Sequence, residues 1–437
     1  MDRRDWMRAL GGLGSLGALA STALPAIALP TDPTDPADPA RIAASAGEAP
    51  SLRGTGDLAV IVLRASGALA IVETTGGRLL GRVDGLGDLS HASVVFSRDA
   101  LRAYVFGRDG GLSVVNLLSR RIEQRLMQAG NAIGGAISAD GRRVAAQNYS
   151  PGGVRVFDAT SLAPLADIPA WRQPGAIGPQ PPGGLPADDP AAQRSRVVGL
   201  ADVAGDRMAW SLFDADAILL ADFSADPAEP RLLRLDGIGR QPYDALVTPD
   251  GRHYIAGLFG EDGLALVDLW DERPKVRRIL DGYGRGSQPL PVYKMPHLRG
   301  WAVAGRHAFL PAIGRHEVLV VDTTTWREVD RIPVAGQPVF VMARPDGRQI
   351  WVNFAVPDYH RVQVIDAPTR RVLRTLEPGR AVLHLEFSPR GEQVWISCRD
   401  DDRVLVYDTR TLAECGRLDL PAPSGIFMSA RAHRIGL

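Results

Sequence analysis

Apolar and polar positions alternate in short runs that recur along the chain from residue 91 onward. Each unit has an apolar strand, a tight turn such as "SADGRRVAAQ" or "TPDGRHYIAG", a second apolar strand, and a third strand such as "VLVVDTTTW". The third strand closes on an acid or amide at intervals mostly between 42 and 54 residues: Asn116, Asp158, Asp222, Asp268, Asp322, Asp366 and Asp408. A repeat of short strands at this spacing is typical of β-propeller blades.

Seven complete units fit between residues 90 and 423, and the two chain ends supply an eighth. Residues 58–64 (LAVIVLR) and 68–73 (ALAIVE) resemble two strands without an inner pair, whereas "SGIFMSA" and "HRIGL" at the C-terminus resemble an inner pair. Joining them closes the ring and leaves no open sheet edge. The sequence therefore predicts an all-β fold, a single eight-bladed β-propeller over residues 51–437, with a closing blade built from both chain ends.

The N-terminal segment has the pattern of an export signal. Arg3-Arg4 precede a weakly apolar, glycine-rich run, and small residues follow at 26–28, so residues 1–28 predict a twin-arginine-like signal and a periplasmic protein. General secretion and a retained anchor are the alternatives. Residues 29–50 are rich in proline and aspartate, which is typical of a flexible linker. The segment 170–195 predicts a long loop inserted between two blades.

Charge and motif content exclude several function classes. Lysine plus arginine equals aspartate plus glutamate, 50 each, so no net field favours nucleic acid. The sequence has no GxGxxG between a strand and a helix, no GxxxxGK[ST], no GxSxG and no HExxH, which argues against a nucleotide-fold dehydrogenase, a kinase, a serine hydrolase and a zinc protease. It has no CxxCH, so no covalent c-type heme is expected. Cys398 and Cys415 are predicted to be free thiols on different strands of one sheet, with a disulfide as the alternative.

Three of the eight histidines are candidates for one central site. His91, His297 and His384 each begin a predicted inner strand, seven to nine residues before the turn glycine or its equivalent. Inner strands line the channel of a propeller, so histidines from three separate blades would face one axial cavity. A zinc site is possible, but their separation around the ring better suits a wide, flat ligand, and imidazole is a common axial ligand of porphyrin iron.

Other polar residues fall on the same predicted face. Arg108, Arg315 and Arg399 lie in loops between second and third strands, where guanidinium groups could pair with the carboxylates of a tetrapyrrole. A solvated charged rim is the alternative. Tyr243 and Asp244 begin an inner strand and could supply a proton donor and acceptor.

The stretch "SHASVVFSRDALRAYVFGRDGGLSVVNL" resembles the d1 propeller domain of cytochrome cd1 nitrite reductase. In that family a proximal histidine starts an early inner strand and "GRD" ends the next, which implies that His91 is the axial iron ligand and His297 a distal histidine. Nothing near Gln337-Pro338 matches the second distal histidine, which argues against nitrite reduction. The lack of CxxCH also departs from the c-heme-bearing dehydrogenase of heme d1 maturation.

What remains resembles the NirF family of heme d1 biosynthesis, most specifically in "YDALVTPDGRHYIAGLFGEDGLALVDLW" and "LHLEFSPRGEQVWISCRDDDRVLVYDT". The resemblance implies a periplasmic protein that binds heme d1 or a late precursor in the central cavity and modifies its peripheral side chains towards dihydro-heme d1. Its catalytic candidates are His297, His384, Tyr243 and Asp244. The alternative is a non-catalytic carrier that delivers the tetrapyrrole to the maturation dehydrogenase and to nitrite reductase. A generic interaction module would leave the placement of the histidines unexplained.

Overall fold

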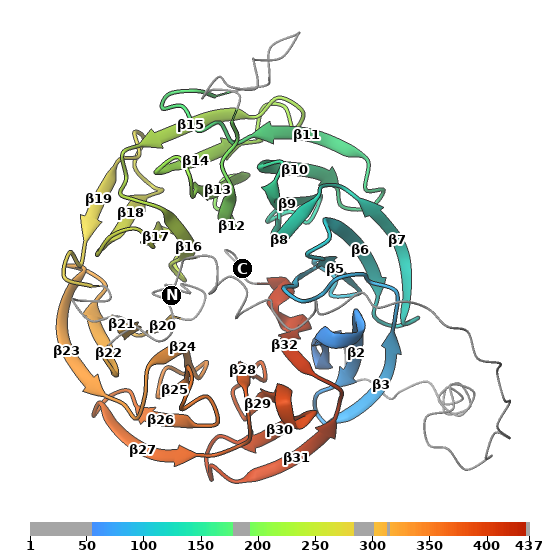
Figure 1. Cartoon of the computed structure of the whole chain (residues 1–437), viewed down its shortest axis with the longest axis vertical. Coiled ribbons are helices and arrows are strands. Elements are labelled where there is room, and N and C mark those ends of the chain that lie inside the picture. The colour runs from blue at the N-terminus through green and yellow to red at the C-terminus, as the bar shows by residue number, and fades with distance from the viewer. Residues whose placement is uncertain (1–54, 178–192, 284–300, 313–314, 434–437) are drawn as a thin grey trace, which may run out of the picture. The chain divides into compact units, whose positions relative to one another are not determined.

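The computed structural model describes residues 55–177, 193–283, 301–312 and 315–433. These residues form eight four-stranded antiparallel sheets arranged as blades around a central axis (Figure 1). The predicted eight-bladed propeller is therefore confirmed. The predicted signal, residues 1–28, and linker, residues 29–50, lie outside the described residues.

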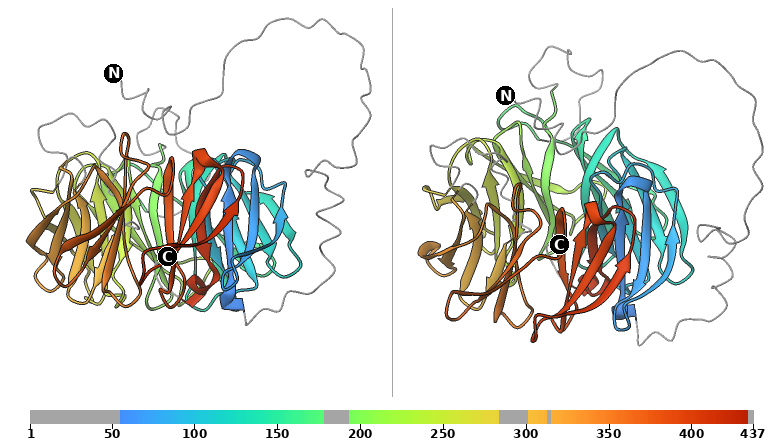
Figure 2. Two further views of the ribbon diagram at one scale, coloured as in Figure 1. Left: turned by 90° about the horizontal axis from the view of Figure 1, so that it is seen from below. Right: turned by 60° about the horizontal axis from the view of Figure 1, so that its bottom comes forward.

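Within each blade the strands follow one another outward from the axis, and the strands run between the two faces of the ring (Figure 2). The strands of blades 1 to 4 are β4 (Ser93–Phe96), β5 (Arg102–Phe106), β6 (Gly111–Asn116), β7 (Arg121–Met127); β8 (Asn131–Ile137), β9 (Arg143–Ser150), β10 (Gly153–Asp158), β11 (Pro164–Pro169); β12 (Val197–Val203), β13 (Arg207–Leu212), β14 (Ala217–Asp222), β15 (Arg231–Asp236); and β16 (Pro242–Val247), β17 (His253–Leu258), β18 (Leu264–Asp268), β19 (Val276–Ile279). Those of blades 5 to 7 are β20 (Ala302–Ala304), β21 (His307–Ala312), β22 (Glu317–Asp322), β23 (Arg327–Pro333); β24 (Pro338–Ala343), β25 (Gln349–Phe354), β26 (Val362–Asp366), β27 (Arg371–Leu376); and β28 (Val382–Phe387), β29 (Gln393–Cys398), β30 (Arg403–Asp408), β31 (Glu414–Asp419).

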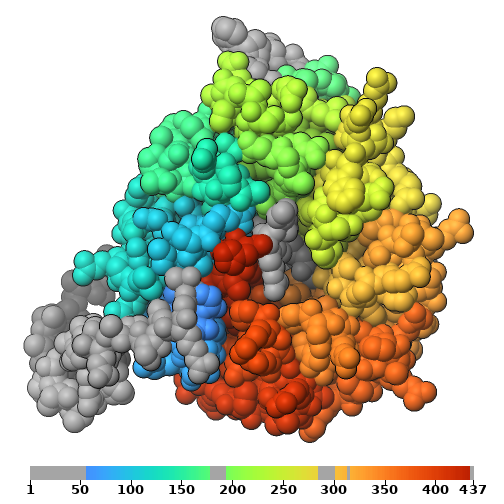
Figure 3. Space-filling view, turned by 180° about the vertical axis from the view of Figure 1, so that it is seen from behind, coloured from blue at the N-terminus to red at the C-terminus, as the bar shows by residue number. Residues whose placement is uncertain are grey.

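The closing blade comes from both chain ends, in the order β32 (Pro423–Met428), β1 (Leu58–Leu63), β2 (Ala68–Glu73) and β3 (Arg78–Val83). Three of its strands come from the N-terminal end of the propeller and only β32 comes from the C-terminal end, so the predicted division into two pairs is wrong. The apolar pattern missed β3 because this outermost strand is mostly exposed. The chain after β32 forms a short 3-10 helix, η7 (Ser429–His433), which lies near the centre of the ring (Figure 3).

The recurring aspartates and glycines have a structural role in the turns. Asp408, for example, accepts hydrogen bonds from the backbone N–H groups of Arg410 and Thr411 at 2.9 and 2.8 Å, which closes the turn between the third and fourth strands. Gly391, in the turn between the first and second strands, has a φ of 72°, where a side chain is disfavoured. These two residue types therefore recur because the backbone of each blade requires them.

The cysteine prediction is confirmed. Both thiols are free: Cys398 is buried on β29 and Cys415 is exposed on β31. Burial raises the pKa of the Cys398 thiol to about 12, so it stays protonated at neutral pH. The inserted loop joins β11 to β12 as predicted, and its described ends meet where Trp171 pairs with Arg194. Among the described residues, no helix is long and apolar enough to cross a bilayer.

Candidate functional site

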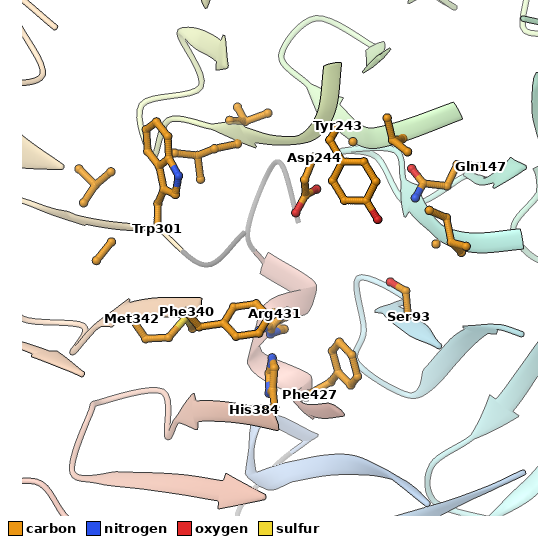
Figure 4. A pocket seen from close by; sticks show the side chains of 18 of the residues that line it. Ser93, Gln147, Tyr243, Asp244, Trp301, Phe340, Met342, His384, Phe427 and Arg431 are labelled. Atoms are coloured by element: carbon orange, nitrogen blue, oxygen red, sulfur yellow. The ribbon is translucent and has the colours of Figure 1, made fainter. Parts of the chain in front are cut away.

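A cavity of about 720 Å³ occupies the centre of the propeller and is lined from all eight blades (Figure 4). This volume lies within the usual range for small-molecule sites. Its lining residues are His91, Ala92, Ser93, Ile133, Gly134, Gln147, Val198, Gly199, Tyr243, Asp244, Leu246, Val247, Pro249, Trp301, Ala302, Val303, Phe340, Met342, Ala343, His384, Phe427, Arg431 and His433. The wall is mainly apolar, with a small number of polar groups, as is typical of a binding site for an organic ligand.

One position of the inner strand faces the cavity in blade after blade. In five blades the backbone N–H of the first turn residue donates to a carbonyl five residues later in the same blade, for example Ser388 to Gln393 and Thr248 to His253. This shared hydrogen bond identifies equivalent positions in the five blades. The residue four positions before this turn residue lines the cavity in all five blades. In blades 1, 2, 4, 6 and 7 it is Ser93, Gly134, Asp244, Phe340 and His384, respectively. Asp244 and His384 are therefore equivalent residues of blades 4 and 7.

β-Bulges set the direction of these side chains. In β28 the pairing with β29 shifts between Val382 and Leu385, so that Leu383 and His384 lie opposite one residue. The backbone N–H of His384 then donates to the Ser397 hydroxyl at 3.0 Å. β16 has the same irregularity at Tyr243 and Asp244. An extra residue in a strand turns its side chain away from the regular alternation, and here it turns the side chain into the cavity.

His384 is held as a neutral imidazole. Its Nδ1 accepts a hydrogen bond from the backbone N–H of Ile426 at 3.2 Å, and its ring stacks on Phe427, with 5.7 Å between centroids, and meets Phe340 edge-on. Burial lowers its pKa to about 4, opposed by the charge of Glu386 and assisted by that of Arg431. A neutral imidazole that accepts at Nδ1 carries its proton on Nε2, so His384 offers a hydrogen-bond donor at that atom.

Tyr243 and Asp244 lie side by side on the opposite wall (Figure 4). The Tyr149 hydroxyl donates to the Tyr243 hydroxyl at 3.4 Å, and Phe213 and Phe259 surround the Tyr243 ring. Burial raises the pKa of Tyr243 well above its usual value, so the phenol stays protonated at neutral pH. The Asp244 carboxylate accepts from the backbone N–H of Ala245 at 2.9 Å and points towards the cavity.

The three predicted histidines do not share one position. His91 lines the cavity, but it lies in the loop two residues before Ser93, which is the blade 1 equivalent of His384. Counting from the turn glycine concealed this difference, because the allowed spacing of seven to nine residues spans it. His91 is exposed at the entrance of β4, whereas His384 is part of the strand wall. His297 lies outside the described residues.

Of the predicted arginines, Arg108 and Arg399 form part of a cationic group and Arg315 does not. Burial lowers the pKa of Arg64, and the nearby charges of Arg399 and Arg108 lower it further, while Asp88 opposes them. Arg64 lies in the short 3-10 helix η3 (Arg64–Ser66) between β1 and β2, and sequence reasoning missed it. These three arginines come from blades 7, 1 and the closing blade.

The contacts of the individual arginines separate them further. Arg399 also pairs with Asp400 at 2.7 Å, and the Arg108 guanidinium lies 5.8 Å from the Tyr149 ring centroid. Arg315 is exposed, and none of the three predicted arginines is among the lining residues.

At the other end of the cavity, η7 contributes Arg431 and His433 to the lining. Its Arg431 forms a two-pronged ion pair with Glu386, a side chain only 3% exposed, and its Ala432 carbonyl accepts from Arg98 at 2.6 Å. Glu386 follows His384 by two residues on β28, the spacing that returns a side chain to the same face of a strand. This period could have predicted Glu386 from the sequence, but the Arg431 partner depends on the path of the chain after β32.

No group of three or more His, Cys, Asp or Glu side chains within the described ranges could hold a metal ion. Within those ranges the possible metal ligands of the cavity are separate side chains, so the described residues give no support to the alternative of a zinc site.

Comparison with known proteins identifies the family. A family model described as the cytochrome D1 heme domain matches residues 53–432. Protein NirF of Stutzerimonas stutzeri is 58% identical over 386 residues, which cover 88% of this chain and 95% of that protein. The chain belongs to the NirF family. Protein NirF of Pseudomonas aeruginosa is 56% identical over 396 residues, covering 91% of this chain and 97% of that one. As a member of the NirF family, the protein is related to heme d1 biosynthesis.

Solved structures show the same fold outside the NirF family. Dihydro-heme d1 dehydrogenase NirN in complex with DHE matches with a TM-score of 0.72 and 22% identity, covering 89% of this chain and 79% of that one. By sequence, the dihydro-heme d1 dehydrogenase of Pseudomonas aeruginosa is 28% identical over 349 residues, covering 77% of this chain and 64% of that protein. AztD of Citrobacter koseri matches with a TM-score of 0.57 and 10% identity, covering 84% of this chain and 96% of that one.

Proposed function

We propose that this protein binds a late iron-tetrapyrrole precursor of heme d1 in the central cavity and modifies the peripheral side chains of that precursor. His91 is the proposed axial ligand of the iron, because it lines the cavity and a neutral imidazole is a common ligand of tetrapyrrole iron. Membership of the NirF family and the fold shared with dihydro-heme d1 dehydrogenase support the class of substrate.

The residues of the cavity fit such a substrate. Trp301, Phe340 and Met342 give apolar surface for the faces of a macrocycle. Arg64, Arg108 and Arg399 gather positive charge from three neighbouring blades, which suits the carboxylates of a tetrapyrrole. Bound in this way, the iron would supply an electrophilic centre at the middle of the ligand, while the chain's own groups act at its edge.

One observation supports a catalytic role rather than binding alone: a carboxylate and two neutral hydrogen-bond donors face the same mainly apolar cavity. Among the described residues no basic side chain forms an ion pair with Asp244, and a backbone N–H is its partner. Next to it the Tyr243 hydroxyl is a donor, and across the cavity the Nε2–H of His384 is another. In this arrangement Asp244 would accept a proton from the substrate periphery, while Tyr243 and His384 would donate to oxygen atoms of the substrate. A carrier requires an axial ligand and apolar walls, but it does not require a half-buried carboxylate that faces the ligand.

Replacing Asp244 by asparagine tests the proposal against the carrier alternative. The variant Asp244→Asn keeps the shape and the acceptor for the backbone N–H of Ala245, but loses the base. We expect tetrapyrrole binding to persist and product formation per bound ligand to fall by about 100-fold or more, the lower end of the usual contribution of a general base. Unchanged turnover with intact binding would favour the carrier. His297, which lies outside the described residues, is a second catalytic candidate from the sequence.

The place of action and the partners belong to the same proposal. The Arg3-Arg4 segment supports export to the periplasm, where the product would pass to the dihydro-heme d1 dehydrogenase and to cytochrome cd1 nitrite reductase. Fractionation of cells expressing the full chain tests the location. Transfer of bound tetrapyrrole to either purified partner tests the sequence of events.

A further inference from the structure

Blade 2 breaks the pattern of the cavity wall. At the position where blades 1, 4, 6 and 7 place Ser93, Asp244, Phe340 and His384, blade 2 has Gly134, which has no side chain. Gly134 pairs with Gln147 of β9, the second strand of the blade. A Cβ atom at Gly134 would lie 3.0 Å from Gln147 Nε2. The glycine therefore leaves a gap in the inner strand, and the Gln147 amide reaches the cavity through it.

The two ends of the Gln147 amide are not equivalent. Its Oε1 accepts a hydrogen bond from the backbone N–H of Leu200 in blade 3 at 2.9 Å, which fixes the orientation of the amide plane. Its Nε2 has no hydrogen-bond partner among the described residues, although the side chain is buried, with 8% exposed. An amide N–H₂ group carries two donors, and Gln147 presents this group to the cavity that it lines, where a ligand can accept a hydrogen bond from it.

We propose that the Nε2–H₂ group of Gln147 donates a hydrogen bond to a carbonyl oxygen on the edge of the bound tetrapyrrole. This inference rests on the proposed function, because it needs a tetrapyrrole in the cavity. A neutral oxygen fits better than a carboxylate here, since the neighbouring lining residues Ile133 and Val198 are apolar and would leave a carboxylate without a counterion. The carboxylates of the tetrapyrrole would instead pair with the arginines of blades 7, 1 and the closing blade. Gln147 is thus a specificity residue for a carbonyl group on the ring.

The experiment compares two iron tetrapyrroles that differ in ring carbonyls. Heme d1 carries carbonyl oxygens on its ring, whereas iron protoporphyrin IX has carboxylates as its only oxygen groups. The affinity of the full chain for each is measured by absorption titration for wild type, Gln147→Met and Gln147→Glu. The glutamate variant keeps the acceptor for Leu200 N–H and, measured at pH 8, replaces the donor by a carboxylate that repels a carbonyl oxygen, whereas the methionine variant removes the donor without adding a charge.

Loss of one neutral hydrogen bond predicts that heme d1 binding weakens about 3- to 10-fold in Gln147→Met, and the added charge predicts a larger loss in Gln147→Glu. Binding of iron protoporphyrin IX should stay unchanged in Gln147→Met. In the infrared spectrum of bound heme d1, a ring carbonyl band should move to higher wavenumber in both variants, which a purely structural role would not cause. Gly134→Ala, whose added methyl group pushes the amide aside, should have the same effect. Gln363→Met is the control, because Gln363 is equally buried but both ends of its amide are bonded within blade 6 and to Ala335.

The outcomes separate the two proposals. If wild type binds heme d1 but Gln147→Met weakens the binding of both tetrapyrroles equally, or of neither, and the carbonyl band does not move, the role of Gln147 is refuted while the proposed function stands. If wild type binds no tetrapyrrole, both are refuted.

Discussion

The backbone N–H of Ile426 donates a hydrogen bond to Nδ1 of His384 at 3.2 Å and links the inner strand of the closing blade to that of blade 7. Histidines that bind metal usually donate from one ring nitrogen to a neighbouring acceptor and bind the metal through the other. His384 does the reverse, because its Nδ1 is already an acceptor. At neutral pH it therefore directs an N–H group, rather than a lone pair, at the cavity, and it is a poor candidate for an iron ligand.

The low pKa of His384 predicts a loss of stability in acid. Above pH 6.5 the residue is neutral in both the folded and unfolded states, so its contribution is complete there. As the pH falls from 6.5 towards the folded pKa of about 4, the unfolded state binds a proton that the folded state does not, and stability is lost. We expect the free energy of unfolding to fall by about 2 kcal/mol more in wild type than in His384→Gln between pH 7.5 and pH 4.5.

Urea unfolding at the two pH values measures this difference. His316→Gln is the control, because His316 is exposed and should leave the pH dependence as in wild type. The same pH dependence in wild type and His384→Gln would show that His384 is not held neutral by the fold.

The ion pair between Arg431 and Glu386 predicts that the floor of the cavity stabilises the protein. Glu386 is 3% exposed and Arg431 is 14% exposed, so removal of one charge leaves the other without a partner in a buried setting. We expect Glu386→Gln to lower the free energy of unfolding by about 3 kcal/mol. Glu328→Gln breaks the more exposed pair with Arg331 and should cost less than about 1 kcal/mol. Equal losses in denaturant unfolding would contradict a special role for the floor.

The cationic group of Arg64, Arg108 and Arg399 predicts a charge-dependent step in tetrapyrrole binding. Arg108→Gln should weaken binding about 10- to 150-fold, since a charge-assisted hydrogen bond to a carboxylate contributes roughly 1.5–3 kcal/mol. The variant should also show a smaller loss of affinity on adding salt. Arg315→Gln, in the corresponding loop of blade 5, is exposed and should bind as wild type does. Titrations at low and high salt measure both effects, and an unchanged affinity in Arg108→Gln would exclude the carboxylate contact.

The fold could be predicted from the sequence because each blade repeats its own local requirements. The aspartate that closes the third strand and the glycine in the first turn recur for reasons contained within one blade, as the contacts of Asp408 show. The exception is β3, whose exposed outer position gives it no apolar pattern. A strand of this kind is recognised from its pairing with β2, which the sequence does not contain.

The site could be predicted only incompletely, because some of its residues depend on contacts between blades. His384, Tyr243 and Asp244 lie on inner strands, and the repeat places them in the cavity wall. Arg64 was missed because its place beside Arg108 and Arg399 follows from ring closure. Gln147 was missed because it lies on a second strand and reaches the cavity through the space above Gly134. Residues of both kinds become visible only when neighbouring strands are in register.

The position of His91 as axial ligand is the central claim, and an absorption spectrum tests it most directly. Wild type, His91→Ala and the exposed control His316→Ala are each mixed with heme d1 and the Soret band is recorded. A shifted Soret band in wild type and in His316→Ala, with the shift absent in His91→Ala, is the predicted result, because the variant lacks the imidazole that binds the iron. The same shift in all three proteins would contradict the account and remove His91 from the iron.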